Sequence, residues 1–211
     1  MNIYDEMTKI GVIPVVKIED PSDTFPLVEA MAKGGLPAAE ITFRTAHALG
    51  AIEQVAKRLP DVLVGAGTVT NADQAKRAID AGAKFIVGPG LSAKVAKVCR
   101  EQNVVYLPGC VTPTEIIAAL DEGITTVKFF PASVYGGLKA IKALSAPFTT
   151  VKFLPTGGVN ATNLAEYLTF DRIAACGGSW MAEPSIVREK RFDEIEKLCR
   201  EASDIVKTVR G

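Results

Sequence analysis

The sequence predicts a single-domain α/β fold, a (βα)8 or TIM barrel, that spans residues 1–211. Short apolar runs rich in β-branched residues recur eight times, and each is followed by a stretch with helical character. The runs start about 19 to 27 residues apart, which leaves room for a strand, a loop and a helix but is too long for a β-hairpin. No linker interrupts the series, so the repeats indicate one closed barrel.

Several of the predicted strands are apolar on both faces, which is typical of parallel strands that are covered on both sides. The alternative architecture is an open, doubly wound parallel sheet. The eight strands are predicted at residues 12–16, 39–43, 63–67, 85–88, 104–108, 125–129, 150–154 and 172–176.

Cap-forming residues support the helices between the strands. Asn71 precedes one predicted helix, and Thr112 with Glu115 forms a capping-box pattern before another. Residues 1–9 are expected to form an extra helix that caps the bottom of the barrel. An amphipathic pattern that begins at Phe192 predicts the last helix.

The composition argues against several classes of function. Lys plus Arg and Asp plus Glu both number 24, and no long basic run is present, so we expect no nucleic-acid partner. The four cysteines form no C-x-x-C pair and His47 is the only histidine, so we expect no metal and no other cofactor. The sequence has no leader-like segment and no apolar run of bilayer length, which predicts a cytoplasmic protein without a membrane partner.

Lys128 is the first candidate for catalysis. It stands near the end of the sixth predicted strand, between apolar residues. Burial disfavours the charged form of an amine, and a neutral amine can attack a ketone to form a Schiff base. The alternative is a lysine that faces outward and keeps its amine in water.

Lys152 provides a comparison within the same chain, because the heptapeptide TTVKFLP around it nearly repeats the TTVKFFP around Lys128. Layers inside an eight-stranded barrel are filled from alternate strands. If the two prolines lie at equal height, one lysine points inward and the other outward. Even-numbered strands then share a layer, which favours Lys128 together with Glu40.

Glu40 and Arg44 lie at the end of the second predicted strand, where a period of two places both on one face with Thr42. Glu40 can act as a general acid and base, and Arg44 can bind a substrate carboxylate through two hydrogen bonds. The alternative is an internal Glu-Arg ion pair without a catalytic role.

Glycines follow the last two predicted strands, in the segments Thr156-Gly157-Gly158 and Gly177-Gly178-Ser179. Barrels commonly bind phosphate at the loops after strands seven and eight, where backbone amides at helix starts contact the anion. The two segments therefore predict a phosphate site, and ordinary glycine turns are the alternative.

Six motifs in a fixed order and spacing carry a resemblance to a known family. The chain resembles the 2-keto-3-deoxy-6-phosphogluconate (KDPG) and 4-hydroxy-2-oxoglutarate (KHG) aldolases, which are class I lyases, from about Gly11 to Met181. Phe43 and Gly88 depart from the residues common in the family and bear on substrate preference. The motifs are EITFRT (40–45), VGAGTV (64–69), PGL (89–91), KFFPA (128–132), PTGG (155–158) and GGSW (177–180).

The resemblance implies that Lys128 forms the Schiff base and that Glu40 is the acid and base. It also implies a homotrimer, no metal, and a keto acid substrate that carries a phosphate. The other implied positions bind substrate: Arg44 and Thr68 hold the carboxylate, Pro89 lines the pocket, Thr156 selects the gluconate over the galactonate epimer, and Gly157, Gly158 and Ser179 bind the phosphate.

Two other functions fit the same barrel. A phosphosugar isomerase or epimerase would use Glu40 as its base and Lys128 as an electrostatic stabiliser, without a covalent step. A phosphate-binding barrel would have no catalytic activity. Fold alone does not separate these from a lyase.

Overall fold

Eight parallel strands and ten α-helices alternate along residues 2–211, which are the residues that the computed structural model describes. The strands are β1 (Val12–Val16), β2 (Ala38–Thr42), β3 (Leu63–Gly67), β4 (Phe85–Val87), β5 (Val105–Leu107), β6 (Thr126–Phe129), β7 (Lys152–Pro155) and β8 (Cys176–Gly178). The helices are α1 (Ile3–Ile10), α2 (Thr24–Lys33), α3 (Ala48–Arg58), α4 (Ala72–Asp80), α5 (Ala93–Glu101), α6 (Pro113–Asp121), α7 (Gly137–Ser145), α8 (Leu164–Leu168), α9 (Pro184–Arg188) and α10 (Phe192–Arg210), with 3-10 turns η1 (Pro21–Asp23) and η2 (Trp180–Ala182).

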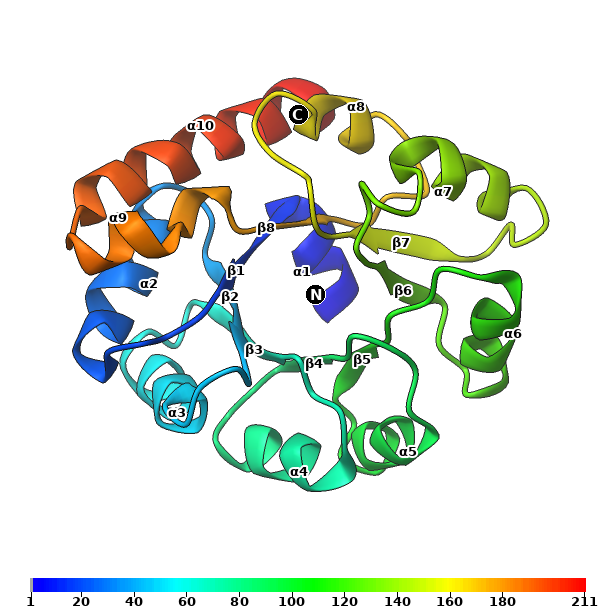
Figure 1. The fold of residues 1–211 in the computed structure, drawn as a ribbon, viewed down its shortest axis with the longest axis horizontal. Helices are drawn as coiled ribbons and strands as arrows, with labels where there is room; N and C mark the ends of the chain where they lie inside the picture. The colour runs from blue at the N-terminus through cyan, green and yellow to red at the C-terminus, as the bar shows by residue number, and fades with distance from the viewer. Residues whose placement is uncertain (1) are drawn as a thin grey trace.

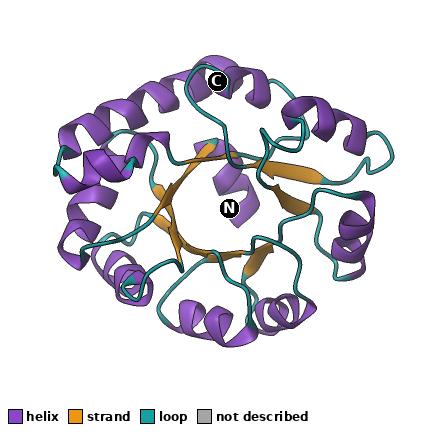
Figure 2. Cartoon of the chain, viewed as in Figure 1, coloured by secondary structure: helices purple, strands orange, loops and turns teal. Residues whose placement is uncertain are grey.

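The strands form a curved parallel arrangement with helices outside it (Figures 1 and 2). Six strands pair in the order β5-β4-β3-β2-β1-β8, and β6 pairs with β7 in a second sheet. Isolated parallel bridges join the two sheets, between Gly109 and Lys128 on one side and between Thr156 and Gly177 on the other. The doubly wound alternative is wrong, because that fold reverses its strand order and here β1 to β5 follow the chain.

Seven of the predicted strands agree with the structure to within two residues at each end, but the eighth is displaced. It was expected at residues 172–176 and lies at Cys176–Gly178, where it pairs with Val12–Pro14 of β1. Gly177 and Gly178 are therefore inside a strand and not in the loop after it. Sequence patterns miss such a strand because glycine is unfavourable in strand interiors.

Two apolar clusters fill the two faces of the curved sheet. The outer cluster lies between the strands and the helices. The inner cluster gathers side chains from the concave faces of the strands, which we call the inner face, and from α1: Met7, Ile13, Ala38, Leu63, Phe85, Val87, Leu107, Leu154 and Ala175. Because these residues come from strands on opposite sides, the inner cluster is a packed core without an open channel.

The helix α1 covers the end of the inner cluster where the strands begin. Its Met7 is 1% exposed and packs against the inner cluster. The Asn2 side chain caps its first turn by accepting a hydrogen bond from the Asp5 N–H at 2.9 Å. Gly11 ends the helix in the left-handed conformation, with φ of 75°. The predicted N-terminal capping helix is confirmed over Ile3–Ile10, while Met1 lies outside the described residues.

Arg210 fastens the end of α10 to the same side of the molecule. Its guanidinium donates hydrogen bonds to the backbone carbonyls of Thr8 at 3.1 Å, Ile173 at 2.7 Å and Ala174 at 2.9 Å. The last helix predicted from Phe192 onward is thus confirmed, and it is fixed to both α1 and the segment before β8. Among the described residues, no helix is long and apolar enough to cross a membrane.

Buried thiols give a prediction that tests this packing. Burial raises the pKa of Cys99, Cys110, Cys176 and Cys199 to about 12, so only about one thiol in ten thousand is ionised at pH 8. We expect iodoacetamide at pH 8 to leave the folded protein unmodified and to alkylate four cysteines in guanidinium chloride, as read by intact mass. Rapid labelling of any cysteine in the folded protein would contradict the described packing.

Candidate active site

A buried ion pair joins strands on opposite sides of the inner face. The Lys128 Nζ lies 3.1 Å from the Glu40 Oε1, and the two side chains are 7% and 1% exposed. Lys128 is on β6 and Glu40 on β2, strands that are not neighbours in either sheet. The two residues therefore meet across the interior, and the outward alternative for Lys128 is wrong.

Strand periodicity explains why Lys128 points inward. Its neighbours Val127 and Phe129 are both fully buried in the outer cluster, beneath the helices. Side chains alternate between the faces of a strand, so Lys128 must lie on the inner face. The Phe130 ring lies 5.3 Å from the Lys128 Nζ, close enough for a cation-π contact.

Gly67 on β3 provides the space for the Glu40 carboxylate. A Cβ atom at position 67 would overlap the Glu40 Oε1 and its Cγ. Gly67 is the last residue of β3 and pairs with Thr42. The signal that could have distinguished it is its register opposite the strand that carries Glu40.

One oxygen of Glu40 remains without a hydrogen-bond partner. The Oε1 atom accepts from Lys128, whereas the Oε2 atom is buried and unpartnered among the described residues. An unsatisfied carboxylate oxygen is costly in a protein interior and calls for an explanation. Here it gives the site a free acceptor for a hydroxyl group or a water beside the amine.

Lys152 corrects the expectation that the two lysines face opposite ways. Phe153 belongs to the outer cluster and Leu154 to the inner one, so alternation places Lys152 on the inner side as well. The expectation assumed that Pro131 and Pro155 lie at equal height. Instead Lys128 pairs with Leu154, and Lys152 pairs with Thr126.

This register places the two lysines at different levels of the interior. Lys152 is exposed at the beginning of β7, where it lines a cavity together with Asp5, Lys9 and Arg210. Lys128 is buried and contacts Glu40, and it lies level with Leu154, two residues beyond Lys152. The heptapeptides are nearly identical, yet only the first places its amine beside a carboxylate in the interior.

The segment after β2 carries Arg44 at the rim of the site. Thr42 donates a hydrogen bond to the Val16 carbonyl at 3.0 Å, and Thr45 donates one to the Ile18 carbonyl at 2.7 Å. Arg44 between them is exposed, and among the described residues no ion pair joins it to Glu40. The internal Glu-Arg pair considered from sequence is therefore wrong, because Lys128 takes the place of the arginine.

Two more predicted positions lie where strands end. Thr68 directly follows β3 and has φ of 60°, a conformation that is rare for a β-branched residue. Such strained backbone is often found at functional sites. Pro89 follows β4 by two residues and is exposed. Both residues lie just beyond the carboxyl ends of their strands.

The predicted phosphate segments lie side by side. Thr156 forms a parallel bridge with Gly177, and a Cβ atom at Gly177 would overlap the Thr156 hydroxyl. Gly157 and Gly158 have φ of 91° and 81°, which favours glycine. Ser179 is exposed beyond β8 and directly precedes η2.

The first of these segments is fixed to the segment after Lys128. The Ala132 N–H donates to the Thr156 carbonyl at 2.8 Å, and the Ser133 N–H donates to the Gly157 carbonyl at 3.1 Å. The expectation that both glycine segments open helices is only half right, because α8 starts at Leu164, well after Gly158. The turn conformation must then present the Gly157 and Gly158 backbone without a helix behind it.

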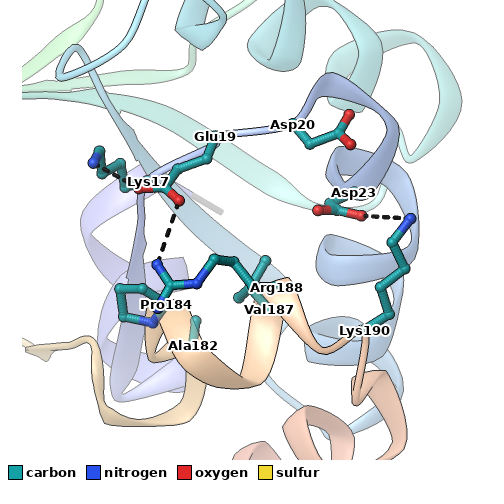
Figure 3. Close-up of a pocket in the computed structure, with 9 residues that line it drawn as sticks. All are labelled: Lys17, Glu19, Asp20, Asp23, Ala182, Pro184, Val187, Arg188 and Lys190. Carbon is teal, nitrogen blue, oxygen red and sulfur yellow. Dashed lines mark hydrogen bonds and ion pairs between the residues drawn. The ribbon is translucent and has the colours of Figure 1, made fainter.

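A separate cavity of about 160 Å³ lies between the segment after β1 and α9 (Figure 3). Charged side chains line it in opposite pairs: Lys17 and Arg188 contact Glu19 at 2.8 and 3.7 Å, and Lys190 contacts Asp23 at 3.7 Å. Neither Lys128 nor Glu40 lines this cavity. Its lysine and arginine side chains already have carboxylate partners within the cavity.

The described residues contain no group of three or more His, Cys, Asp or Glu side chains that could hold a metal ion. His47 is exposed at the N-cap position of α3, without a capping hydrogen bond from its side chain.

Comparison with known proteins identifies the family. A family model described as KDPG and KHG aldolase matches residues 3–198. The chain belongs to this family. The "2-dehydro-3-deoxy-phosphogluconate aldolase" of Haemophilus influenzae is 42% identical over 205 residues and covers 97% of each chain. The "KHG/KDPG aldolase" of Escherichia coli K12 is 37% identical over 196 residues, 93% of this chain and 92% of that one.

A solved structure agrees with the fold. The KDPG aldolase of Legionella pneumophila, captured with pyruvate as a covalent carbinolamine intermediate, superposes with a TM-score of 0.91. It is 35% identical and the match covers 95% of this chain and 98% of that chain. The resemblance inferred from the six motifs is thereby confirmed.

Gly67→Ala tests whether the space beside Glu40 matters. The added methyl group must displace the Glu40 carboxylate from Lys128, so we expect the rate of keto acid cleavage to fall by roughly a hundredfold, the effect of a misplacement of about 1 Å. Steady-state assays with KDPG would measure it.

Gly50→Ala is the matched control, because a Cβ atom at that position in α3 meets nothing within 4 Å. It should keep wild-type activity and raise helix stability by about 0.5 to 1 kcal/mol. Unchanged activity in Gly67→Ala would show that the position of the Glu40 carboxylate is not critical.

Proposed function

We propose that this chain is a class I aldolase, a lyase that cleaves KDPG to pyruvate and glyceraldehyde 3-phosphate through a Schiff base on Lys128. KHG, cleaved to pyruvate and glyoxylate, is the second candidate substrate. The observation that carries the proposal is the buried contact of 3.1 Å between the Lys128 Nζ and the Glu40 Oε1. An amine and a carboxylate held together in a site shielded from water support this chemistry, with Lys128 as the nucleophile and Glu40 as the proton acceptor.

The first chemical step requires a neutral amine. Glu40 is placed to accept a proton from the Lys128 ammonium through Oε1, which leaves a lone pair on Nζ. The amine then attacks the C2 carbonyl of the keto acid and forms a carbinolamine. Glu40 then returns the proton to the carbinolamine hydroxyl, which leaves as water, so that an iminium forms and the Glu40 carboxylate is restored. The iminium can accept an electron pair and so takes the part that a metal or cofactor plays in other lyases.

Carbon-carbon cleavage follows from the iminium. Glu40, directly or through one water, removes the proton from the C4 hydroxyl, and the unpartnered Oε2 is the available acceptor. The C3–C4 bond breaks and its electrons move into the iminium, which releases glyceraldehyde 3-phosphate and leaves an enamine. Protonation at C3 regenerates the iminium, and hydrolysis by water releases pyruvate and the free lysine.

The rim residues are proposed to bind the two ends of the substrate. Arg44 and Thr68 would hold the carboxylate, and Pro89 would line the pocket beside them. The other end belongs to the neighbouring β7 and β8 segments, where Gly157, Gly158 and Ser179 would bind the phosphate and Thr156 would select the gluconate epimer. Binding at both ends orients the C3–C4 bond relative to Lys128.

The same proposal includes the setting of the enzyme. We propose that the eight strands form one closed barrel and that residues 1–211 form a single domain, supported by the bridges between the two sheets and by the shared inner cluster. We further propose a homotrimer in the cytoplasm that uses no cofactor, as the family resemblance and the composition suggest.

Borohydride trapping tests the covalent step. Incubation of the protein with pyruvate and sodium borohydride should add one reduced pyruvyl group per chain, and peptide mapping should place it on Lys128. Lys128→Met should abolish both the adduct and KDPG cleavage. Lys152→Met is the matched control and should retain both the adduct and KDPG cleavage. Lys152 lies at the beginning of β7, whereas Lys128 lies near the end of β6.

An unmodified wild-type mass would overturn the Schiff-base proposal and favour an isomerase or epimerase without a covalent step. Complete inactivity on phosphorylated and unphosphorylated keto acids, with a folded protein, would favour a binding protein. Loss of the adduct in Lys152→Met but not in Lys128→Met would mean that the lysines have been assigned the wrong way round.

Arg44→Ala tests the carboxylate site. Loss of a charged hydrogen-bonding partner costs about 1.5 to 3 kcal/mol, so we expect the KM for KDPG to rise by roughly 10-fold to 150-fold with little change in thermal stability. Arg77→Ala on α4, whose side chain is 59% exposed, is the control and should leave the KM unchanged. A normal KM in Arg44→Ala would remove Arg44 from the binding site.

A further inference from the structure

The hydroxyl of Tyr106 joins two backbone groups in the segment that follows β4. Tyr106 lies on β5, is 3% exposed, and turns its ring toward the outer cluster. Its hydroxyl accepts a hydrogen bond from the Ser92 N–H at 3.2 Å and donates one to the Gly90 carbonyl at 3.0 Å. The ring fills space in the outer cluster, whereas the hydroxyl bonds to the backbone of the loop after β4.

The segment held by this hydroxyl, residues 88–92, fits closely against β5. The Gly88 N–H donates to the Leu107 carbonyl at 3.1 Å. A Cβ atom at Gly88 would lie 2.7 Å from both the Gly90 carbonyl oxygen and the Tyr106 hydroxyl, and one at Gly109 would overlap the Pro89 carbonyl. The segment is thus confined between Tyr106 and Gly109.

Gly109 also borders the strand that carries Lys128. Gly109 and Lys128 form a parallel bridge. The Lys128 N–H donates to the Pro108 carbonyl at 2.8 Å, and the Lys128 carbonyl accepts from the Cys110 N–H at 2.9 Å. The backbone at Gly109 therefore contacts Pro89 on one side and pairs with Lys128 of β6 on the other. A shift of the Pro89 segment would change the wall of the site nearest to β6.

The Tyr106 hydroxyl is suited to a permanent role as donor. Burial raises its pKa well above the ordinary value for tyrosine, an effect to which Cys99 and Cys110 add, while the Ser92 N–H opposes it. The hydroxyl thus keeps its proton throughout the physiological pH range, so that its bond to Gly90 persists. Ser92 is also the N-cap residue of α5, which ties the segment to a helix start.

We propose that Tyr106 is a positioning residue for the keto acid site, which acts by holding the Pro89–Ser92 segment against the end of β5 beside the Lys128 strand. This inference rests on the proposed aldolase function. It predicts that the Tyr106 hydroxyl affects substrate binding although it does not face the inner site.

Tyr106→Phe tests the inference, since the ring stays in place and only the hydroxyl is lost. Two neutral hydrogen bonds disappear, so we expect the KM for KDPG to rise about fivefold while kcat changes by less than about twofold, the pattern of lost binding common to ground and transition states. Hydrogen exchange read by mass spectrometry should accelerate in peptides that contain the Ser92 amide. Tyr4→Phe on α1 is the control and should change neither the KM nor the exchange at Ser92.

The outcomes separate this inference from the proposed function. A wild-type protein that gains no pyruvyl adduct would overturn both. A wild-type adduct, together with a Tyr106→Phe variant of unchanged KM, would overturn only the role of Tyr106, whether or not the variant melts at a lower temperature. A raised KM together with faster exchange at Ser92, and neither change in Tyr4→Phe, supports the role.

Discussion

The pairing of Lys128 with Glu40 in the interior is the constraint on which the rest of the structure depends. Burying one charge alone costs several kcal/mol, and a pair is tolerated only when the geometry brings the two groups together. A sheet that curls until β2 faces β6 meets this requirement. Such a pair is weak support for stability, since apolar residues would fill the same space at lower cost. In the proposed mechanism its value is chemical, because it keeps an amine and its proposed proton acceptor within one hydrogen bond.

Small residues around the pair make the geometry possible. Gly67 leaves room for the carboxylate, and Gly177 leaves room for the Thr156 hydroxyl. The Thr156 Oγ1 and the Glu40 Oε2 are both buried without partners. Buried oxygens without partners suit a ligand with several polar groups, such as the proposed hydroxylated keto acid. Polar atoms that are left unpaired in a packed protein often mark the place where function opposes stability.

The sequence predicted the repeated strands and the N-terminal helix, because periodicity is set by short-range geometry, while the family resemblance assigned Lys128 and Glu40 to one site. Prediction from sequence failed where the outcome depends on register between strands. Lys152 was expected to face outward, and the two-residue offset between β6 and β7 was invisible in the nearly identical heptapeptides. The predicted position of β8 was also wrong, since two of its three residues are glycines and give no apolar strand pattern. The hydrogen bond between Tyr106 and Gly90 could not be predicted, because it joins a side chain on β5 to the backbone of the loop after β4.

Both ends of the described chain are held at the side where the strands begin. Arg210 reaches the carbonyl of Thr8, so the last helix and the first are physically tied, while Lys128, Arg44 and Ser179 lie toward the other side. A polypeptide fused to either end would therefore start on the side opposite to the proposed substrate site. This polarity gives a fusion partner or a surface linker two attachment points that lie away from that site.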